Sequence, residues 1–240
     1  MHSPTLIALA KQSAILRSID TLAANVSNAS TSGFRRSGVD FSGYMHAVLQ
    51  GQSVSFPFDV ESYIDLKPGP AQATFNPLDL IIEGNERAFF VVEKNGGQVL
   101  TKNGQMKLDA AGRLVDSGGN VLVGEDDRPI VVGADTESVT FLADGSVKSA
   151  DFVVGRLKVV EVPDASALSR LGSSGFVVPK GAARATGFVV RSGMLEGANV
   201  DMIGEISALI QMSRDFEMLQ QLLSIEDSRK NDVIEKLPQV

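Results

Sequence analysis

The stretch Leu22–Arg36, LAANVSNASTSGFRR, contains no carboxylate, and small polar residues fill its middle before a Gly, a Phe and two Arg. It follows a segment in which apolar residues recur every three or four positions, the spacing of one helix face. Ser3 and Pro4 suit the N-cap and first position of that helix. Asn and Ser side chains compete for backbone hydrogen bonds and disfavour helix interiors. The sequence therefore predicts a helix from about residue 4 to about residue 26 that ends within this stretch.

The composition excludes several classes of protein. The chain has 240 residues with a net charge of -7, which argues against a nucleic-acid partner because phosphate binding needs a basic surface. It has no Cys, so disulfides, thiol catalysis and Cys-ligated metals are excluded. No stretch reaches the roughly 20 apolar residues of a membrane span, so we expect no direct membrane insertion. The first residues lack the pattern of a cleaved Sec signal, and we expect any export to use another route.

Short β-prone runs separated by Gly-containing turns fill the middle of the chain. AFFVVEK-NGG-QVLT, residues 88–101, and FLADGSVKS, residues 141–149, are examples. Such runs are typical of hairpins. We therefore expect a compact all-β domain, barrel-like or sandwich-like, over residues 75–192.

A second helix is predicted from about residue 202, where Asn199 or Asp201 can cap it. Positions 202, 206, 209, 213, 216, 220 and 223 step by four and three, as in a heptad seam. Ser213 and Gln220 are polar members of this seam.

These patterns predict an α+β fold in which long N- and C-terminal helices pair as a coiled-coil-like core beside the central all-β domain. The expected parts are an N-terminal helix and hinge (1–40), an extended connecting segment (41–74), the β-domain (75–192) and a C-terminal helix (193–240). Both terminal helices are amphipathic, and the domain between them offers no obvious partner. We expect them to pair with each other and with neighbouring chains, which is the design of an assembly subunit.

No arrangement of residues indicates catalysis or ligand binding. The two His residues have no acidic partner at metal-ligand spacing, and no phosphate-binding Gly loop or nucleophile motif is present. The acidic run Glu125–Asp127 does not have the spacing of a calcium loop and is better explained as a solvated turn. We therefore expect no catalytic residues, no metal and no cofactor. Arg35 and Arg36 are expected to pair with carboxylates of a neighbouring chain.

Four segments resemble one family. ANVSNASTSGFRRS (24–37) is similar to the N-terminal signature of bacterial flagellar rod and hook proteins, with Asn25, Asn28, Thr31, Gly33, Phe34 and Arg35 at matching positions. NPLDLIIEGNERAFFVV (76–92), TKNGQMKLDAAGRLVDSGGNVLVG (101–124) and GMLEGANVDMIGEISALIQMSRDFEM (193–218) resemble three further segments of the same family, in the same order. The resemblance covers nearly the whole chain.

The resemblance implies a structural subunit of the flagellar basal-body rod, most like the proximal-rod members of the family. Such a subunit polymerises through its terminal helices into a tubular drive shaft that transmits torque and encloses the export channel. The implied partners are copies of the chain, other rod proteins and the flagellar type III export apparatus, and the implied location is the rod where it crosses the periplasm. A distal-rod or other axial protein is the alternative, and a ligand-binding β-domain with helical oligomerisation arms is a weaker one.

On this interpretation the residues at subunit interfaces come from both ends of the chain. Gly33 is expected to adopt a backbone conformation closed to other residues, and Phe34 to fill a pocket on a neighbour. The expected interface residues are Leu6, Leu9, Ile15, Ile19, Leu22, Val26, Asn28, Thr31, Gly33, Phe34, Arg35, Leu195, Asn199, Val200, Met202, Ile206, Leu209, Arg214, Phe216, Leu219 and Leu223.

Overall fold

The computed structural model describes residues 4–49, 52–133, 139–150 and 152–235. The chain divides into two compact units. The helical unit comprises Met1–Ser27, Ser37–Tyr63 and Asp201–Val240, and the β unit comprises Asn28–Arg36 and Ile64–Val200. Residues 28–36, which we expected to belong with the first helix, are therefore part of the β unit.

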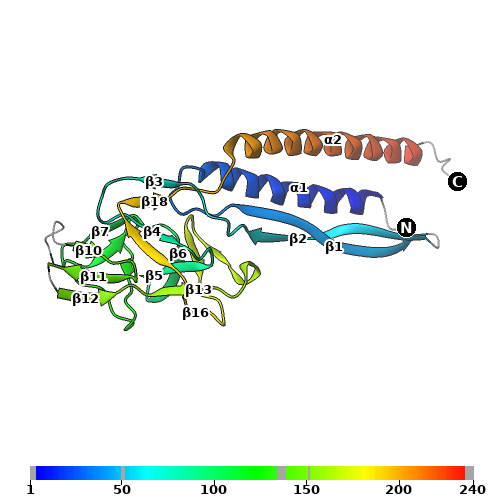
Figure 1. Cartoon of the computed structure of the whole chain (residues 1–240). Coiled ribbons are helices and arrows are strands. Elements are labelled where there is room, and N and C mark those ends of the chain that lie inside the picture. Colours follow the sequence, from blue (N-terminus) through cyan, green and yellow to red (C-terminus); the bar gives the residue numbers. More distant parts are fainter. Residues whose placement is uncertain (1–3, 50–51, 134–138, 151, 236–240) are drawn as a thin grey trace. The chain divides into compact units, whose positions relative to one another are not determined.

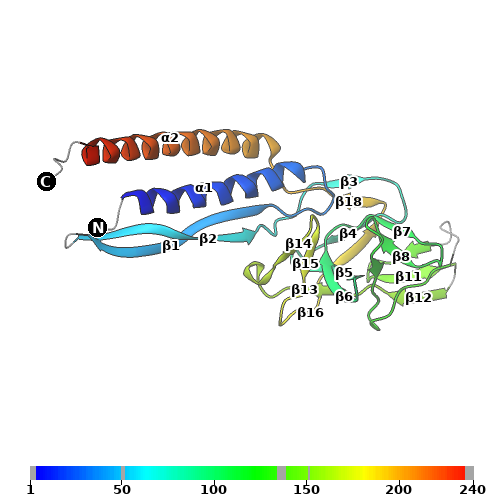
Figure 2. The same cartoon turned by 180° about the vertical axis from the view of Figure 1, so that it is seen from behind.

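The helical unit contains two helices and a two-stranded sheet. The elements are α1 (Pro4–Ser27), β1 (Ser37–Leu49), β2 (Gln52–Ile64) and α2 (Met202–Glu235), and β1 pairs with β2. Within this unit α1 contacts both α2 and β1, and it runs between them in Figures 1 and 2. Neither helix in the described ranges is long and apolar enough to cross a membrane.

The predicted fold class is wrong. Among the described residues there are eighteen strands and only two α-helices, of which α1 spans 24 residues, so long paired helices do not form the core of the fold. The predicted heptad seam matches the buried face of α2 only in part. Its members Met202, Ile206 and Gln220 are exposed, and the other four are half-buried, whereas the buried residues Glu205 and Leu219 lie outside it. The segment that we expected to be an extended connection supplies β1 and β2. α1 therefore packs against β1 as well as against α2, so the two helices are not an isolated coiled coil.

The β unit is built from sixteen strands and one 3-10 helix in the described part of the chain. They are β3 (Ala71–Ala73), β4 (Leu80–Glu83), β5 (Ala88–Lys94), β6 (Gly97–Thr101), β7 (Met106–Leu108), β8 (Leu114–Asp116), β9 (Val121–Leu122), β10 (Val139–Phe141), β11 (Ser146–Ser149), β12 (Phe152–Arg156), β13 (Val159–Glu161), η2 (Ala165–Ala167), β14 (Arg170–Leu171), β15 (Gly175–Val177), β16 (Ala183–Arg184), β17 (Val189–Ser192) and β18 (Met194–Glu196). The largest sheet runs β14-β15-β6-β5-β9-β8-β7, with β13 and β16 joined to it through β5. Separate sheets are formed by β10-β11-β12, by β17 with β4 and by β18 with β3.

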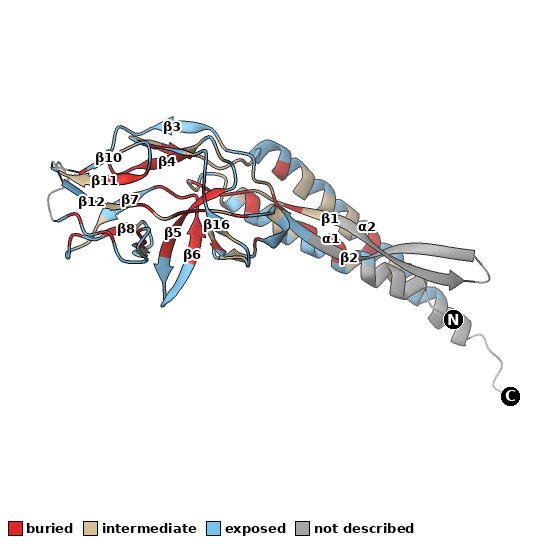
Figure 3. Cartoon of the chain, turned by 60° about the horizontal axis from the view of Figure 1, so that its bottom comes forward, coloured by how far each residue is buried: buried red, intermediate tan, exposed pale blue. Residues whose placement is uncertain are grey.

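Strand β5 separates two hydrophobic clusters. Ala88, Phe90 and Val92 belong to one cluster, and Phe89 and Val91 belong to the other. Successive side chains of a strand point to opposite faces, so both faces of β5 are covered. Figure 3 shows the burial along β4, β5 and β6. This explains why the sequence AFFVV is a continuous apolar run rather than an alternating one.

Phe75 is an exposed aromatic residue on a strained backbone. Its φ is +59°, and 89% of its surface is exposed. The N–H groups of Thr74 and Phe75 both donate to the carbonyl of Gly193, at 2.9 and 3.0 Å. Asn76 Oδ1 accepts from the N–H of Leu78 at 3.2 Å. These bonds hold a conformation that bulky residues rarely adopt.

We expect Phe75→Gly to raise the free energy of unfolding by about 1 kcal/mol, because Gly adopts positive φ without a Cβ clash and little packing is lost. Calorimetry of the purified chain measures this as a higher Tm. Ala150→Gly, at φ +51°, is the control that relieves similar strain without removing a ring. A lower Tm for Phe75→Gly would mean that the ring packs within the subunit in solution.

Candidate functional site

Three segments far apart in the sequence meet in the β unit, and we call this meeting point the junction: Gly33–Arg36, Asp65–Ala71 and Leu195–Asn199. Strand β18 pairs antiparallel with β3, which brings Glu196 opposite Ala71. The N–H of Gly33 donates to the carbonyl of Glu196 at 2.7 Å. The segment after α1 is therefore bonded to the segment before α2 within one chain.

A buried ion pair lies at the centre of the junction. Arg35 Nη1 donates to Glu196 Oε1, and the two side chains are 0% and 3% exposed. The same carboxylate oxygen accepts from the N–H of Gly69 at 3.0 Å. A charge buried without its partner is strongly destabilising, so each of these side chains needs the other.

The side-chain amide of Asn199 connects the same three segments by hydrogen bonds to the backbone. Its Nδ2 donates to the carbonyls of Asp65 and Lys67, at 3.0 and 2.9 Å. Its Oδ1 accepts from the N–H of Arg36 at 2.6 Å. Both amide hydrogens and the amide oxygen are thus used, which no other side chain of this size could reproduce.

Phe34 is buried beside an arginine from a distant strand. The guanidinium of Arg170 lies 4.5 Å from the centre of the Phe34 ring and 5.2 Å from that of Phe176. Arg170 Nη2 also donates to the carbonyl of Arg35. Burial lowers the pKa of Arg170. The stacked cation therefore joins β14 to the junction.

Gly33 is required by both its conformation and its surroundings. Its φ is +69°, and a Cβ there would lie 2.3 Å from the carbonyl carbon of Lys102. The expectation that Gly33 takes a conformation closed to other residues agrees with this geometry.

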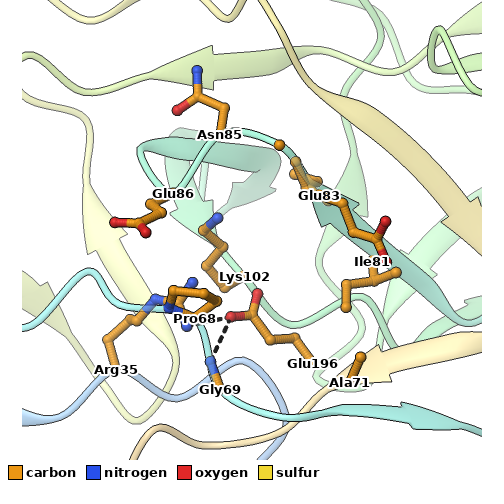
Figure 4. Close-up of a pocket in the computed structure, with 12 residues that line it drawn as sticks. Arg35, Pro68, Gly69, Ala71, Ile81, Glu83, Asn85, Glu86, Lys102 and Glu196 are labelled. Atoms are coloured by element: carbon orange, nitrogen blue, oxygen red, sulfur yellow. Dashed lines mark hydrogen bonds and ion pairs between the residues drawn. The ribbon is translucent and has the colours of Figure 1, made fainter.

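Lys102 lies beside the ion pair and is itself buried. It is 3% exposed, and its Nζ lies 5.0 Å from the centre of the Phe89 ring. Burial lowers the pKa of Lys102 from 10.5 to about 8, and the charge of Arg35 acts in the same direction, while Glu196 and Glu86 oppose it. Figure 4 shows Lys102 with Arg35, Glu196 and Glu86 around one cavity.

A second set of hydrogen bonds, made by the side chain of Asn25, connects three elements of the helical unit. Asn25 Nδ2 donates to the carbonyl of Ser37 at 2.8 Å and to Glu205 Oε2 at 3.1 Å. Asn25 Oδ1 accepts from the N–H of Ser37 at 3.0 Å. Asn25 and Glu205 are both buried. One side chain thus connects the last turn of α1, the start of β1 and the first turn of α2.

The structure divides the expected interface residues into three groups. Leu6 and Leu9 lie in α1, but their side chains fall outside the described ones. Those buried are Ile15, Gly33, Phe34, Arg35, Leu195 and Leu219; those half-buried are Ile19, Leu22, Val26, Asn28, Thr31, Asn199, Val200, Leu209, Phe216 and Leu223; and those exposed are Met202, Ile206 and Arg214.

Two expected contacts lie within the chain instead of at a neighbour. The carboxylate beside Arg35 is Glu196 of the same chain, and the neighbours of the Phe34 ring include Arg170 of the same chain. The buried residues are thus used inside the subunit, because the two resembling segments pack on each other. Contact of the remaining residues with a neighbouring subunit stays a prediction.

Sequence reasoning did not single out Lys102, Arg170, Glu196 or Glu205 as site residues. Glu196 and Glu205 lie in a segment that matched the family pattern, but a match does not reveal burial or partners. Lys102 lies in another of the resembling segments (101–124), and Arg170 lies outside all four. Within the described residues no group of three or more His, Asp or Glu side chains could hold a metal ion.

We expect Gly33→Ala to lower the free energy of unfolding by about 3 kcal/mol or more, because the added Cβ would collide with backbone atoms that cannot rotate away. Gly96→Ala is the matched control, since Gly96 has φ +78° and nothing lies within 4 Å of the point where its added Cβ would stand. That control should lose only about 1 kcal/mol from backbone strain. Urea unfolding of both variants measures the difference, and equal losses would contradict the packing described here.

The stability of the chain should depend on pH through Lys102. The pKa of Lys102 is about 8 in the folded chain and 10.5 in the unfolded chain. Between pH 8 and pH 10.5 the unfolded chain therefore binds more protons than the folded chain, so the free energy of unfolding rises with pH. Relative to Lys102→Met, the unmodified chain should gain about 3 kcal/mol from pH 8 to pH 10.5. Urea unfolding at several pH values tests this, with the exposed Lys107→Met as control. A difference that stays constant with pH would contradict it.

Comparison with known proteins identifies the family. The family model "Flagellar hook protein FlgE/F/G D1 domain" matches residues 81–149, and the family model "Flagellar basal body rod FlgEFG protein C-terminal" matches residues 191–235. The second match includes Glu196 and Asn199 of the junction.

Three curated relatives align with nearly the whole chain. The flagellar basal-body rod protein FlgF of Mesorhizobium japonicum is 30% identical over 99% of this chain and 98% of its own length. FlgF of Rhizobium meliloti is 27% identical over 99% of this chain and 98% of its own length. FlgF of Caulobacter vibrioides is 27% identical over the full length of both chains. This chain therefore belongs to the flagellar basal-body rod protein family, and it is most like the FlgF members of that family.

Proposed function

We propose that this subunit of the proximal rod polymerises through the surfaces of its terminal helices into part of a tube that transmits torque and encloses the export channel. The family is structural rather than enzymatic, and its place is the flagellar basal body. Its neighbours in the assembly would be copies of itself and other rod and hook proteins.

The observation that carries this proposal is an apolar surface on α2. Seven apolar side chains of this helix are exposed, and we call them the exposed α2 face: Met202, Ile203, Ile206, Ile210, Met218, Leu222 and Ile225. Ile203 is 79% exposed. Single exposed apolar residues are ordinary, but seven on one helix are not.

The exposed α2 face lies opposite the side that α2 packs within its own unit. At 100° per residue, Ile203, Ile210 and Ile225 fall on one side of the helix, whereas Glu205 and Leu219 fall on the other. The latter two are buried. An α-helix that is apolar on two opposite sides needs a second partner, since one packing surface covers only one side. A neighbouring subunit is the partner that the proposed assembly supplies.

Export through the flagellar type III apparatus, without a cleaved Sec signal, is part of the same proposal. The chain has no Cys, so its folding needs no disulfide formation after export. Its stability after export would come from the two hydrophobic clusters and the buried polar contacts described above.

We expect the double variant Ile203→Lys, Ile210→Lys to fold normally but to assemble poorly. Both side chains are exposed, so the free energy of unfolding should change by no more than about 0.5 kcal/mol. Buried in an interface, two added charges would oppose assembly strongly. Swimming of a deletion strain that carries the variant, and electron microscopy of its basal bodies, measure the effect.

Ala110→Lys is the control, because residue 110 is exposed in a turn of the β unit and lies outside α2. It should restore rods and swimming. Normal rods in the double variant would show that the exposed α2 face takes no part in assembly. Normal rods in the deletion strain itself would overturn the proposed function.

A further inference from the structure

Phe75 is the most exposed large apolar side chain in the described part of the chain, at 89%. It follows β3, a strand that pairs only with β18 among the described residues and whose three residues are all exposed. Figure 3 shows this exposure along β3. The ten residues of the segment Pro68–Pro77 carry no charge. An exposed aromatic ring in an uncharged segment is typical of the core of a protein interface, where charged residues are depleted and aromatic residues enriched.

The backbone of Phe75 is held at a φ of +59°, which bulky residues rarely adopt. The other non-Gly residues at positive φ in the described ranges are Asn95, Asp127 and Ala150, and none of them has a large apolar side chain. Gly would adopt this φ without a Cβ clash, and the exposed ring packs little within its own chain. Strained residues of this kind cluster at functional sites, where the surrounding structure holds them in place. The strain at Phe75 therefore points to a contact outside its own chain.

The Phe75 ring is carried by a segment whose backbone is already fixed. The N–H groups of Thr74 and Phe75 donate to the carbonyl of Gly193. Asn76 Nδ2 donates to Asp79 Oδ1 at 3.1 Å, and Asp79 is buried, so this carboxylate is bonded inside the β unit. A side chain on a fixed backbone loses little conformational freedom when it binds, so more of its burial contributes to affinity. These are the properties of an anchor residue at an interface.

The start of α2 provides a surface of matching chemistry. Four residues of the exposed α2 face lie there: Met202, Ile203, Ile206 and Ile210. The only charged residue in the sequence from position 202 to position 213 is Glu205, which is buried and accepts a hydrogen bond from Asn25. A charged group that packed on this surface would lose its water without gaining a partner. The surface therefore favours an uncharged, apolar partner.

We propose that Phe75 of one copy of this chain packs on the start of the exposed α2 face of a second copy. The two surfaces are both apolar and uncharged, and they are different surfaces of the same chain. A contact between two different surfaces can repeat from copy to copy without closing, which builds a helical filament rather than a dimer. A tube needs a contact of this kind. The inference rests on the proposed function and names the residue that covers the exposed α2 face.

Cross-linking tests the contact directly, because the chain has no Cys. Thr74→Cys places a thiol next to Phe75, and Ser207→Cys places one beside Ile203 and Ile210 on the helix surface. Both positions are exposed, and both changes leave every apolar side chain of the contact in place. The deletion strain carries the two variants on separate copies of the chain, and a short bismaleimide is added to its purified basal bodies. We expect a cross-linked dimer of the two variants.

The control replaces Ser207→Cys by Ala110→Cys, which is exposed in a turn of the β unit, and should give at least tenfold less dimer. An equal yield of dimer from Thr74→Cys alone or from Ser207→Cys alone would mean that like surfaces meet, and would overturn the proposal. Normal rods without the expected cross-link would also overturn it, although the proposed function would then stand. Normal rods in the deletion strain itself are a separate result, which concerns the proposed function alone.

Phe75→Gly separates assembly from folding. The variant should have a higher Tm because the backbone strain is relieved, yet it should lower the number of complete rods at least tenfold because the ring is lost. Ala150→Gly relieves similar strain at another exposed residue and should leave the number of rods within twofold. Equal numbers of rods in the two variants would overturn the proposal. Loss of rods in Phe75→Gly without the cross-link to α2 would assign the ring to another rod protein and overturn the second-copy assignment.

Discussion

The ion pair between Arg35 and Glu196 is buried, and it fixes the relative positions of the two chain segments that carry these residues. Each charge has lost its water and is stable only where the other is held. The main chain follows this constraint, since Gly33 bonds to the carbonyl of Glu196 and Gly69 to its carboxylate. Asn199 and Arg170 bond to the backbone of the same segments. The polar groups thus fix how three segments meet, while the apolar clusters around β5 supply most of the burial.

Local patterns predict the local structure well. The first helix is expected to end near residue 26 and ends at Ser27, and the expected turns at residues 95–97 and 144–145 connect paired strands. The strands β1 and β2 are not predicted, although large apolar residues recur at every second position from Val54 to Val60, which is the period of a strand. The heptad seam on α2 is misleading because the helix is apolar on two sides, and spacing alone does not show which side its own chain covers.

The sequence predicts some of the residues that form the junction, but it does not predict which residues they contact. The sequence singles out Gly33, Phe34 and Arg35 as unusual, yet it places their contacts on another chain. Nothing in a sequence tells which of 29 acidic residues a buried arginine will meet, because that depends on how segments 161 residues apart come together. The burial of Lys102 is likewise a property of the packed unit. Long-range polar contacts of this kind can be found only in the structure.

The long separation along the chain between the two halves of the junction has a consequence for the order of folding. Contacts between residues so far apart close a large loop, and such contacts form slowly because the loop must lose its entropy first. Until Asn199 is available, Arg36 and the carbonyls of Asp65 and Lys67 lack the side chain that joins them. The signature after α1 therefore reaches its final structure only in a chain that has been made at least as far as Asn199.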